Sequence, residues 1–141
     1  MKHVVTLIIV ACVSSGCIGE RGPPPLPHSA EVRRITPEGF RYPGGLWVSS
    51  PAPGTVRATL SFDGGGCWKE PEVPSGSFEV RADTLTAQLV WHGGGGARSG
   101  EMCPGAVVRV GYEITMRGIK SGAYTFKLLG RTNPAMRVEV H

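Results

Sequence analysis

Cysteine thiols have the widest chemistry of any side chain in this sequence, and they fall into two groups. Cys12 and Cys17 lie near the N-terminus, and Cys67 and Cys103 lie in the body of the chain. A thiol can be acylated, can pair in a disulfide or can bind a metal ion. The residues around each cysteine decide between these chemistries.

Cys17 ends a segment that is organised as an export signal. Lys2 and His3 precede an apolar run from Val4 to Val10, and small residues lead up to Cys17. The run is too short to span a bilayer, which needs about 20 apolar residues. The small residues before Cys17 resemble the lipobox of bacterial lipoproteins. This resemblance implies cleavage before Cys17, acylation of its thiol and attachment to a membrane through the lipid.

Two other interpretations of the N-terminus stay open. Cys12 follows the string Ile9-Val10-Ala11 and is the alternative lipid site, and an ordinary secretory signal is the third interpretation. If Cys17 is acylated, Ile18 at the next position implies sorting to the outer membrane. The expected location is therefore the cell envelope, as an outer-membrane lipoprotein.

Cys67 and Cys103 are predicted to form a disulfide. An exported domain meets an oxidising compartment, and these cysteines have no histidine partners at metal-binding spacing. Their spacing also differs from the Cys-x-x-Cys of redox enzymes. We expect the bond to join the ends of neighbouring strands.

Histidines offer no catalytic set. Of the four in the chain, only His92 falls within the predicted folded elements. No Gly-x-Ser-x-Gly motif occurs, and a copper centre built on His92, Cys103 and Met116 lacks its second histidine. We therefore predict no catalytic residue, metal or cofactor, and a protein that is not an enzyme.

Tryptophans are the remaining candidates for ligand binding. Trp47 and Trp68 are predicted as a ligand surface on which sugar rings stack, whereas Trp91 alternates with the core-facing residues of its strand. The net charge of +4 comes from scattered Lys and Arg side chains without a basic run. No nucleic-acid partner is expected.

Proline and glycine divide the chain into three parts. Residues 1–16 are the predicted signal, residues 17–30 contain the lipidated cysteine and a Pro-rich tether, and residues 31–141 form the folded domain. Consecutive prolines between Pro23 and Pro27 favour an extended spacer.

Apolar residues of the domain alternate with polar ones, which predicts half-buried strands. The clear segments are Thr55 to Phe62, Ser77 to Ala82, Leu85 to His92, Val107 to Arg117, Tyr124 to Leu128 and Met136 to Val140; the weaker ones are Glu31 to Thr36 and Leu46 to Ser49. No helical period of useful length occurs. The pattern predicts an all-β fold, a single antiparallel β-sandwich of about seven strands. A closed barrel is the alternative.

Ile119, Gly122 and Tyr124 suggest a more specific fold. A long strand followed by an apolar residue, a glycine turn and a tyrosine resembles the last strands of immunoglobulin-like domains in bacterial secreted and surface proteins. The resemblance implies an immunoglobulin-like sandwich in which Tyr124 buries its ring and bonds nearby backbone, as in a tyrosine corner. Phe126 stands where antibody domains have their second cysteine, so an antibody-type disulfide is not implied.

These features lead to three functional hypotheses. The first is a non-enzymatic, membrane-anchored envelope lipoprotein that acts as a structural or protein-binding module. The second is a carbohydrate- or peptidoglycan-binding module that uses Trp47 and Trp68, and the third is a secreted hydrolase with an unrecognised site. The expected partner is an envelope protein or glycan.

Overall fold

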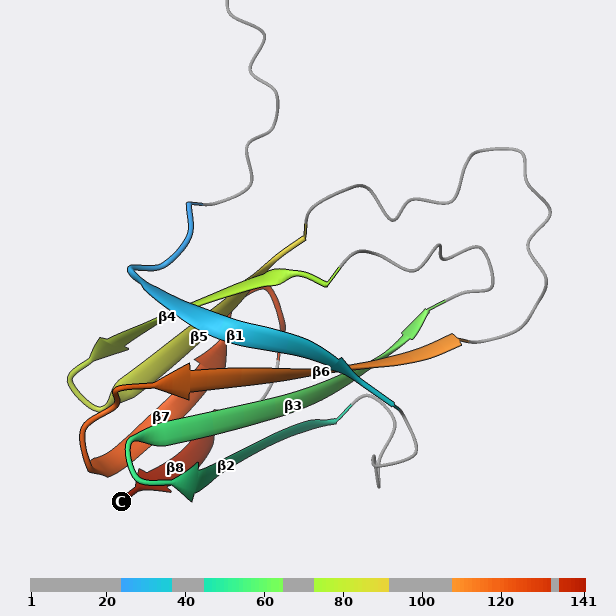
Figure 1. The fold of residues 1–141 in the computed structure, drawn as a ribbon. Coiled ribbons are helices and arrows are strands. Elements are labelled where there is room, and N and C mark those ends of the chain that lie inside the picture. The colour runs from blue at the N-terminus through green and yellow to red at the C-terminus, as the bar shows by residue number, and fades with distance from the viewer. Residues whose placement is uncertain (1–23, 37–44, 65–72, 92–107, 133–134) are drawn as a thin grey trace, which may run out of the picture.

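A computed structural model describes residues 24–36, 45–64, 73–91, 108–132 and 135–141, and its regular structure is entirely β-strand. The all-β prediction is confirmed. These ranges contain no helix of the length and hydropathy needed to cross a membrane. Eight strands follow one another along the chain (Figure 1): β1 (His28–Ile35), β2 (Leu46–Ala52), β3 (Thr55–Gly64), β4 (Ser75–Arg81), β5 (Thr84–Val90), β6 (Val108–Arg117), β7 (Gly122–Leu128) and β8 (Met136–Val140).

The predicted alternation builds the core. Val56 and Leu60 on β3 and Tyr112 and Ile114 on β6 are completely buried, because alternate side chains of a strand point to the same face. The two segments with the weakest patterns also form strands, β1 and β2. The described residues of the domain therefore contain eight strands, where the sequence predicted about seven.

All eight strands belong to one sheet, in the order β2-β3-β6-β1-β4-β5-β7-β8. The sheet curls so far that its edge strands β2 and β8 approach each other, which makes it nearly barrel-shaped (Figure 1). Beside this seam, the Gly54 N–H donates a hydrogen bond to the His141 carbonyl at 3.0 Å. This strand order does not confirm an immunoglobulin-like sandwich.

One strand pairing departs from the predicted antiparallel arrangement. β5 and β7 are parallel, with Leu85 opposite Phe126. The reason is that β6, which lies between them in the chain, pairs with β1 and β3 instead. The chain thus returns to β7 in the direction of β5. Alternation predicts which side chains face inward, but it does not identify the neighbouring strand.

β1 connects the two halves of the sheet. Its first residues, His28 to Ala30, pair with β4, and residues from Glu31 onward pair with β6. The strand begins before Glu31, the predicted start of the domain, so the last residues of the predicted tether belong to the sheet. Pro27 explains this boundary, because proline has no N–H and a strand that needs donors on its backbone begins after it.

β1 passes very close to β4 where it changes partners. A Cβ atom at Gly76 would lie 2.5 Å from Val32 Cγ2 and 3.1 Å from the Ala30 carbonyl oxygen. Such distances are shorter than van der Waals contact. Glycine at position 76 therefore makes room for the strand that joins the two halves.

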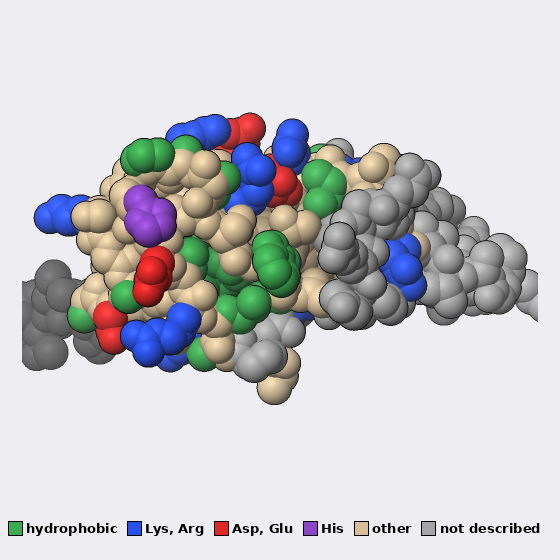
Figure 2. Space-filling view, turned by 90° about the horizontal axis from the view of Figure 1, so that it is seen from below, with side chains coloured by type: hydrophobic (Ala, Val, Ile, Leu, Met, Phe, Trp, Pro, Cys, Tyr) green, Lys and Arg blue, Asp and Glu red, His purple; other side chains and the backbone are tan. Residues whose placement is uncertain are grey.

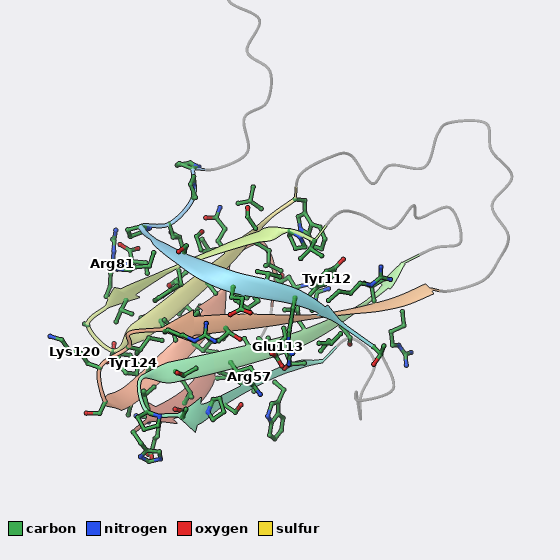
Figure 3. The ribbon with its side chains drawn as sticks, viewed as in Figure 1. Arg57, Arg81, Tyr112, Glu113, Lys120 and Tyr124 are labelled. Atoms are coloured by element: carbon green, nitrogen blue, oxygen red, sulfur yellow. The ribbon has the colours of Figure 1, made fainter. Side chains whose placement is uncertain are left out.

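The predicted tyrosine corner is present between β6 and β7. Tyr124 is buried, and its hydroxyl donates to the Lys120 carbonyl at 3.0 Å (Figure 3). Gly122 has a φ of 151°, which side chains rarely adopt, and a Cβ there would meet the tyrosine ring at 3.6 Å. Ile119, the apolar residue of the motif, is buried in the same turn. The corner is thus present in this sheet, although it does not by itself confirm an immunoglobulin-like sandwich.

Candidate functional site

Most of the predicted site residues lie outside the described part of the chain. This is so for Cys17, for the proposed disulfide partners Cys67 and Cys103, and for Trp68. The lipid attachment, the disulfide and a shared Trp47/Trp68 surface therefore stay predictions. Trp47 lies in β2, and we built the candidate site outward from it.

Trp47 is the most exposed large apolar side chain of the described residues, with 68% of its surface open to solvent. Its neighbours Leu46 and Val48 pack against the core, so Trp47 points to the outer face of the sheet. Figure 2 views the molecule from the side of β2 and β8, and hydrophobic side chains gather near the middle of that view between charged groups. An aromatic ring in this position offers a flat stacking surface.

The register places polar side chains in line with Trp47. Trp47 lies opposite Thr59 on β3, and Thr59 lies opposite Glu113 on β6. Glu113 lies in turn opposite Arg33 on β1. Neighbouring strands are about 4.8 Å apart, so this row extends for roughly 14 Å across four strands.

We call the outward side of these four strands the polar face. Apart from the tryptophan, its members are charged or carry a hydroxyl group. They are Glu31 and Arg33 on β1, Trp47 and Ser49 on β2, Thr55, Arg57 and Thr59 on β3, and Glu113, Thr115 and Arg117 on β6.

Glu113 lies at the centre of the polar face, near Arg57 (Figure 3). Two arginines, Arg33 and Arg57, hold its carboxylate. Arg33 Nε donates to Glu113 Oε1 at 2.7 Å, and Arg57 Nε lies 3.4 Å from the same oxygen. The Glu113 side chain is only 9% exposed, whereas those of Arg33 and Arg57 are 60% and 40% exposed. The hydrogen bond with Glu113 raises the pKa of Arg33. Glu113 thus fixes two guanidinium groups at the surface.

A second ion pair lies beside the first on the same face. Arg117 Nη1 donates to Glu31 Oε2 at 2.7 Å. This hydrogen bond and the charge of Arg117 hold the pKa of Glu31 below its ordinary value. Both side chains are largely exposed, so the pair orients the two groups and adds little stability.

The polar face continues into a shallow hollow where β1 changes partners. The hollow has a volume of about 560 Å³ and includes Glu31, Thr115 and Arg117 of the polar face. His28 and Phe78 form its other side, with their ring centroids 5.2 Å apart. A ligand lying across the strands from Trp47 would reach this hollow at the far end.

Trp91 differs from its predicted position in the core. It is 39% exposed, although its ring meets that of the buried Tyr112 edge-on at a centroid distance of 5.4 Å. β5 ends at Val90, so Trp91 lies just beyond the strand. The residue caps the core instead of lying inside it.

Sequence analysis missed the Arg33–Glu113–Arg57 cluster. Alternation places Glu113 on the outer side of its strand, which predicts a solvated carboxylate, yet the side chain is buried beneath its partners. The sequence does show charged residues at outward positions of β1, β3 and β6, and these were the signal from which the cluster could have been predicted. It becomes specific only when β6 is known to lie between β1 and β3.

Known proteins give no further guide to this face. No protein-family model, curated protein or solved structure matches the chain. Within the ranges that the structure describes, no three His, Cys, Asp or Glu side chains are grouped to hold a metal ion. Function is therefore inferred from the chemistry of the polar face.

The Glu113 carboxylate gives the first prediction. We expect Glu113→Gln to lower the free energy of unfolding by about 1 kcal/mol, because the buried carboxylate that accepts a charged hydrogen bond from Arg33 and pairs with Arg57 loses its charge, while both arginines stay partly solvated. Urea denaturation followed by circular dichroism measures the change. Glu139→Gln, an exposed position on β8, is the control and should alter stability by less than about 0.5 kcal/mol. Equal midpoints for both variants would contradict the structural role of the cluster.

Proposed function

We propose that this protein is a non-enzymatic envelope lipoprotein, anchored through Cys17, whose β domain is a glycan-binding module. The observation that carries the proposal is the polar face, where an exposed tryptophan stands among hydroxyl groups and fixed arginines. The Pro-rich segment that leads to β1 supports an anchored domain, because consecutive prolines make an extended spacer.

The state of the carboxylates favours binding over hydrolysis. Hydrolytic catalysis needs a base within reach of a proton. Glu113 is engaged by Arg33 and Arg57, and Glu31 is engaged by Arg117. These groups are arranged to hold positive charges in place.

The composition of the polar face favours a glycan over a protein partner. Stable protein interfaces have an apolar centre, and about 800 Å² of surface is buried on each partner. Trp47 is the single large apolar member of this face, and its other members are Ser, Thr, Arg and Glu. Sugars combine an apolar ring surface with many hydroxyl groups and so suit both kinds of side chain.

Co-sedimentation with purified peptidoglycan sacculi tests the proposed binding. The full chain, purified in detergent, should pellet with sacculi, and Trp47→Ala should weaken binding about tenfold, the equivalent of about 1.4 kcal/mol. Leu129→Ala is the control, because Leu129 is an exposed apolar residue away from the polar face. Equal pelleting of the two variants, or wild-type protein left in the supernatant, would contradict a glycan site at Trp47.

Metabolic labelling with palmitate tests the anchor. We expect label in the wild type and none in Cys17→Ser, because acylation requires the thiol of the first residue after cleavage. Cys12→Ser is the matched control and should label normally. Labelled Cys17→Ser together with unlabelled Cys12→Ser would move the anchor to Cys12, and an unlabelled wild type would contradict lipidation.

A further inference from the structure

We infer that the polar face selects acidic glycans, with Trp47 stacking on a sugar ring and Arg57 binding the carboxylate of that ring. This inference rests on the proposed glycan binding and specifies the class of sugar. It follows from the charge balance of the Arg33–Glu113–Arg57 cluster and from the position of Trp47 beside it.

The cluster has one more positive charge than it can neutralise. Arg33 and Arg57 share the carboxylate of Glu113, and both approach the same oxygen, Oε1. Arg33 takes the short contact of 2.7 Å, and Arg57 stays at 3.4 Å. The buried Arg57 Nε has no hydrogen-bond acceptor among the described residues. Arg57 is thus the weakly paired cation of the cluster.

The guanidinium group of Arg57 also has donors to spare. Its contact with Glu113 is made by Nε, and a guanidinium group has five N–H donors in a planar fork. The fork matches a carboxylate in a bidentate arrangement. The Arg57 side chain is 40% exposed, so a ligand can approach it from solvent.

Trp47 and Arg57 lie one diagonal step apart on neighbouring strands. Trp47 pairs with Thr59. Ser49, two residues after Trp47 on β2, pairs with Arg57, two residues before Thr59 on the antiparallel β3. Diagonal positions of this kind are about 7 to 8 Å apart. A sugar ring lying on the indole can place its carboxylate within reach of the guanidinium group across that distance.

Further sugars of the same chain would follow the row across the sheet. From Trp47 the row passes Thr59 and Glu113 to Arg33, and Arg117 lies in the hollow beside β1. Hydroxyl groups and a second exposed arginine are thus available along a path of about 14 Å.

Affinity gel electrophoresis with two forms of one polysaccharide tests the inference. Polygalacturonate has a carboxylate on every ring, and its fully methyl-esterified form has the same rings without the charges. We expect the full chain to be retarded at least tenfold more strongly by polygalacturonate. Trp47→Ala should lose retardation, Trp47→Phe should retain it, and Arg57→Gln should lose the preference for the acidic form.

Matched control variants show whether changes in retardation come from the Trp47/Arg57 site or from any exposed charge or apolar residue. Arg81→Gln and Leu129→Ala change an exposed charge and an exposed apolar residue elsewhere, and both should behave as wild type. Thermal unfolding of each variant verifies that it is folded.

Three outcomes would overturn the inference. Equal retardation by both polymers that depends on Trp47 would uphold glycan binding and overturn the preference for acidic sugars. Retardation by neither polymer overturns this inference, and the sacculus assay then reports separately on the proposed function. Retardation by polygalacturonate that Trp47→Ala leaves unchanged would overturn it as well.

Discussion

Replacing Tyr124 with alanine should lower the free energy of unfolding by about 3 to 5 kcal/mol, the usual cost of emptying a large aromatic site in a core. The ring of Tyr124 is buried against the corner formed at Gly122, and its strand neighbours Phe126 and Leu128 are buried on the same side. Urea denaturation of the full chain measures the difference.

A second substitution at the same position separates the contribution of the Tyr124 hydroxyl to stability from that of its ring. Tyr124→Phe removes the hydrogen bond to the Lys120 carbonyl and should cost about 1 kcal/mol. Lys127→Ala, at an exposed position of β7, is the control and should stay within about 0.5 kcal/mol of wild type. A Tyr124→Ala protein with the wild-type midpoint would show that β7 turns its other face to the core.

Gly76→Ala should be the next most damaging of the proposed substitutions, at about 2 kcal/mol. The added methyl group meets Val32 Cγ2 and the Ala30 carbonyl oxygen inside van der Waals distance, so β1 or β4 must move. Overpacking of this kind typically costs about 1 to 3 kcal/mol. Chemical denaturation again provides the measurement.

A double-mutant cycle attributes that cost to the crossing of β1. In the presence of Val32→Ala, the clash with Val32 Cγ2 is gone and Gly76→Ala should cost about 1 kcal/mol less than it does alone. Part of the cost should persist, because the Ala30 carbonyl belongs to the backbone. Strictly additive effects would mean that β1 does not pass Gly76 at the distance seen here.

Local patterns predicted the strands well, since each strand must place alternate side chains in the core. Leu85 and Ala87 on β5 and Val138 and Val140 on β8 are all buried as their alternation requires. Which strands pair with each other has no such local signal in the sequence. Nothing in the alternation of β5 says that β7 will run parallel beside it, and the curl of the sheet follows from those pairings.

The candidate site was predictable only at Trp47. Trp47 and Trp68 were predicted together as a ligand surface. Trp47 is exposed as that surface requires, and Trp68 lies outside the described residues, so the shared surface stays a prediction. The arginines that accompany it come from segments far apart in the sequence: Arg33, Arg57 and Glu113 meet because β6 lies between β1 and β3. Such a cluster depends on strand order, which the charges alone do not reveal.

The position of β1 also determines how the domain responds to mechanical force. A strand at the edge of a sheet can be peeled away, one hydrogen bond after another, while the remaining strands stay together. β1 instead lies between β6 and β4, and it is the strand that directly follows the Pro-rich segment. Tension on that segment acts on hydrogen bonds in the middle of the sheet. Extracting β1 would break its pairing with both β6 and β4, and the two groups of strands would then be held together where β2 meets β8.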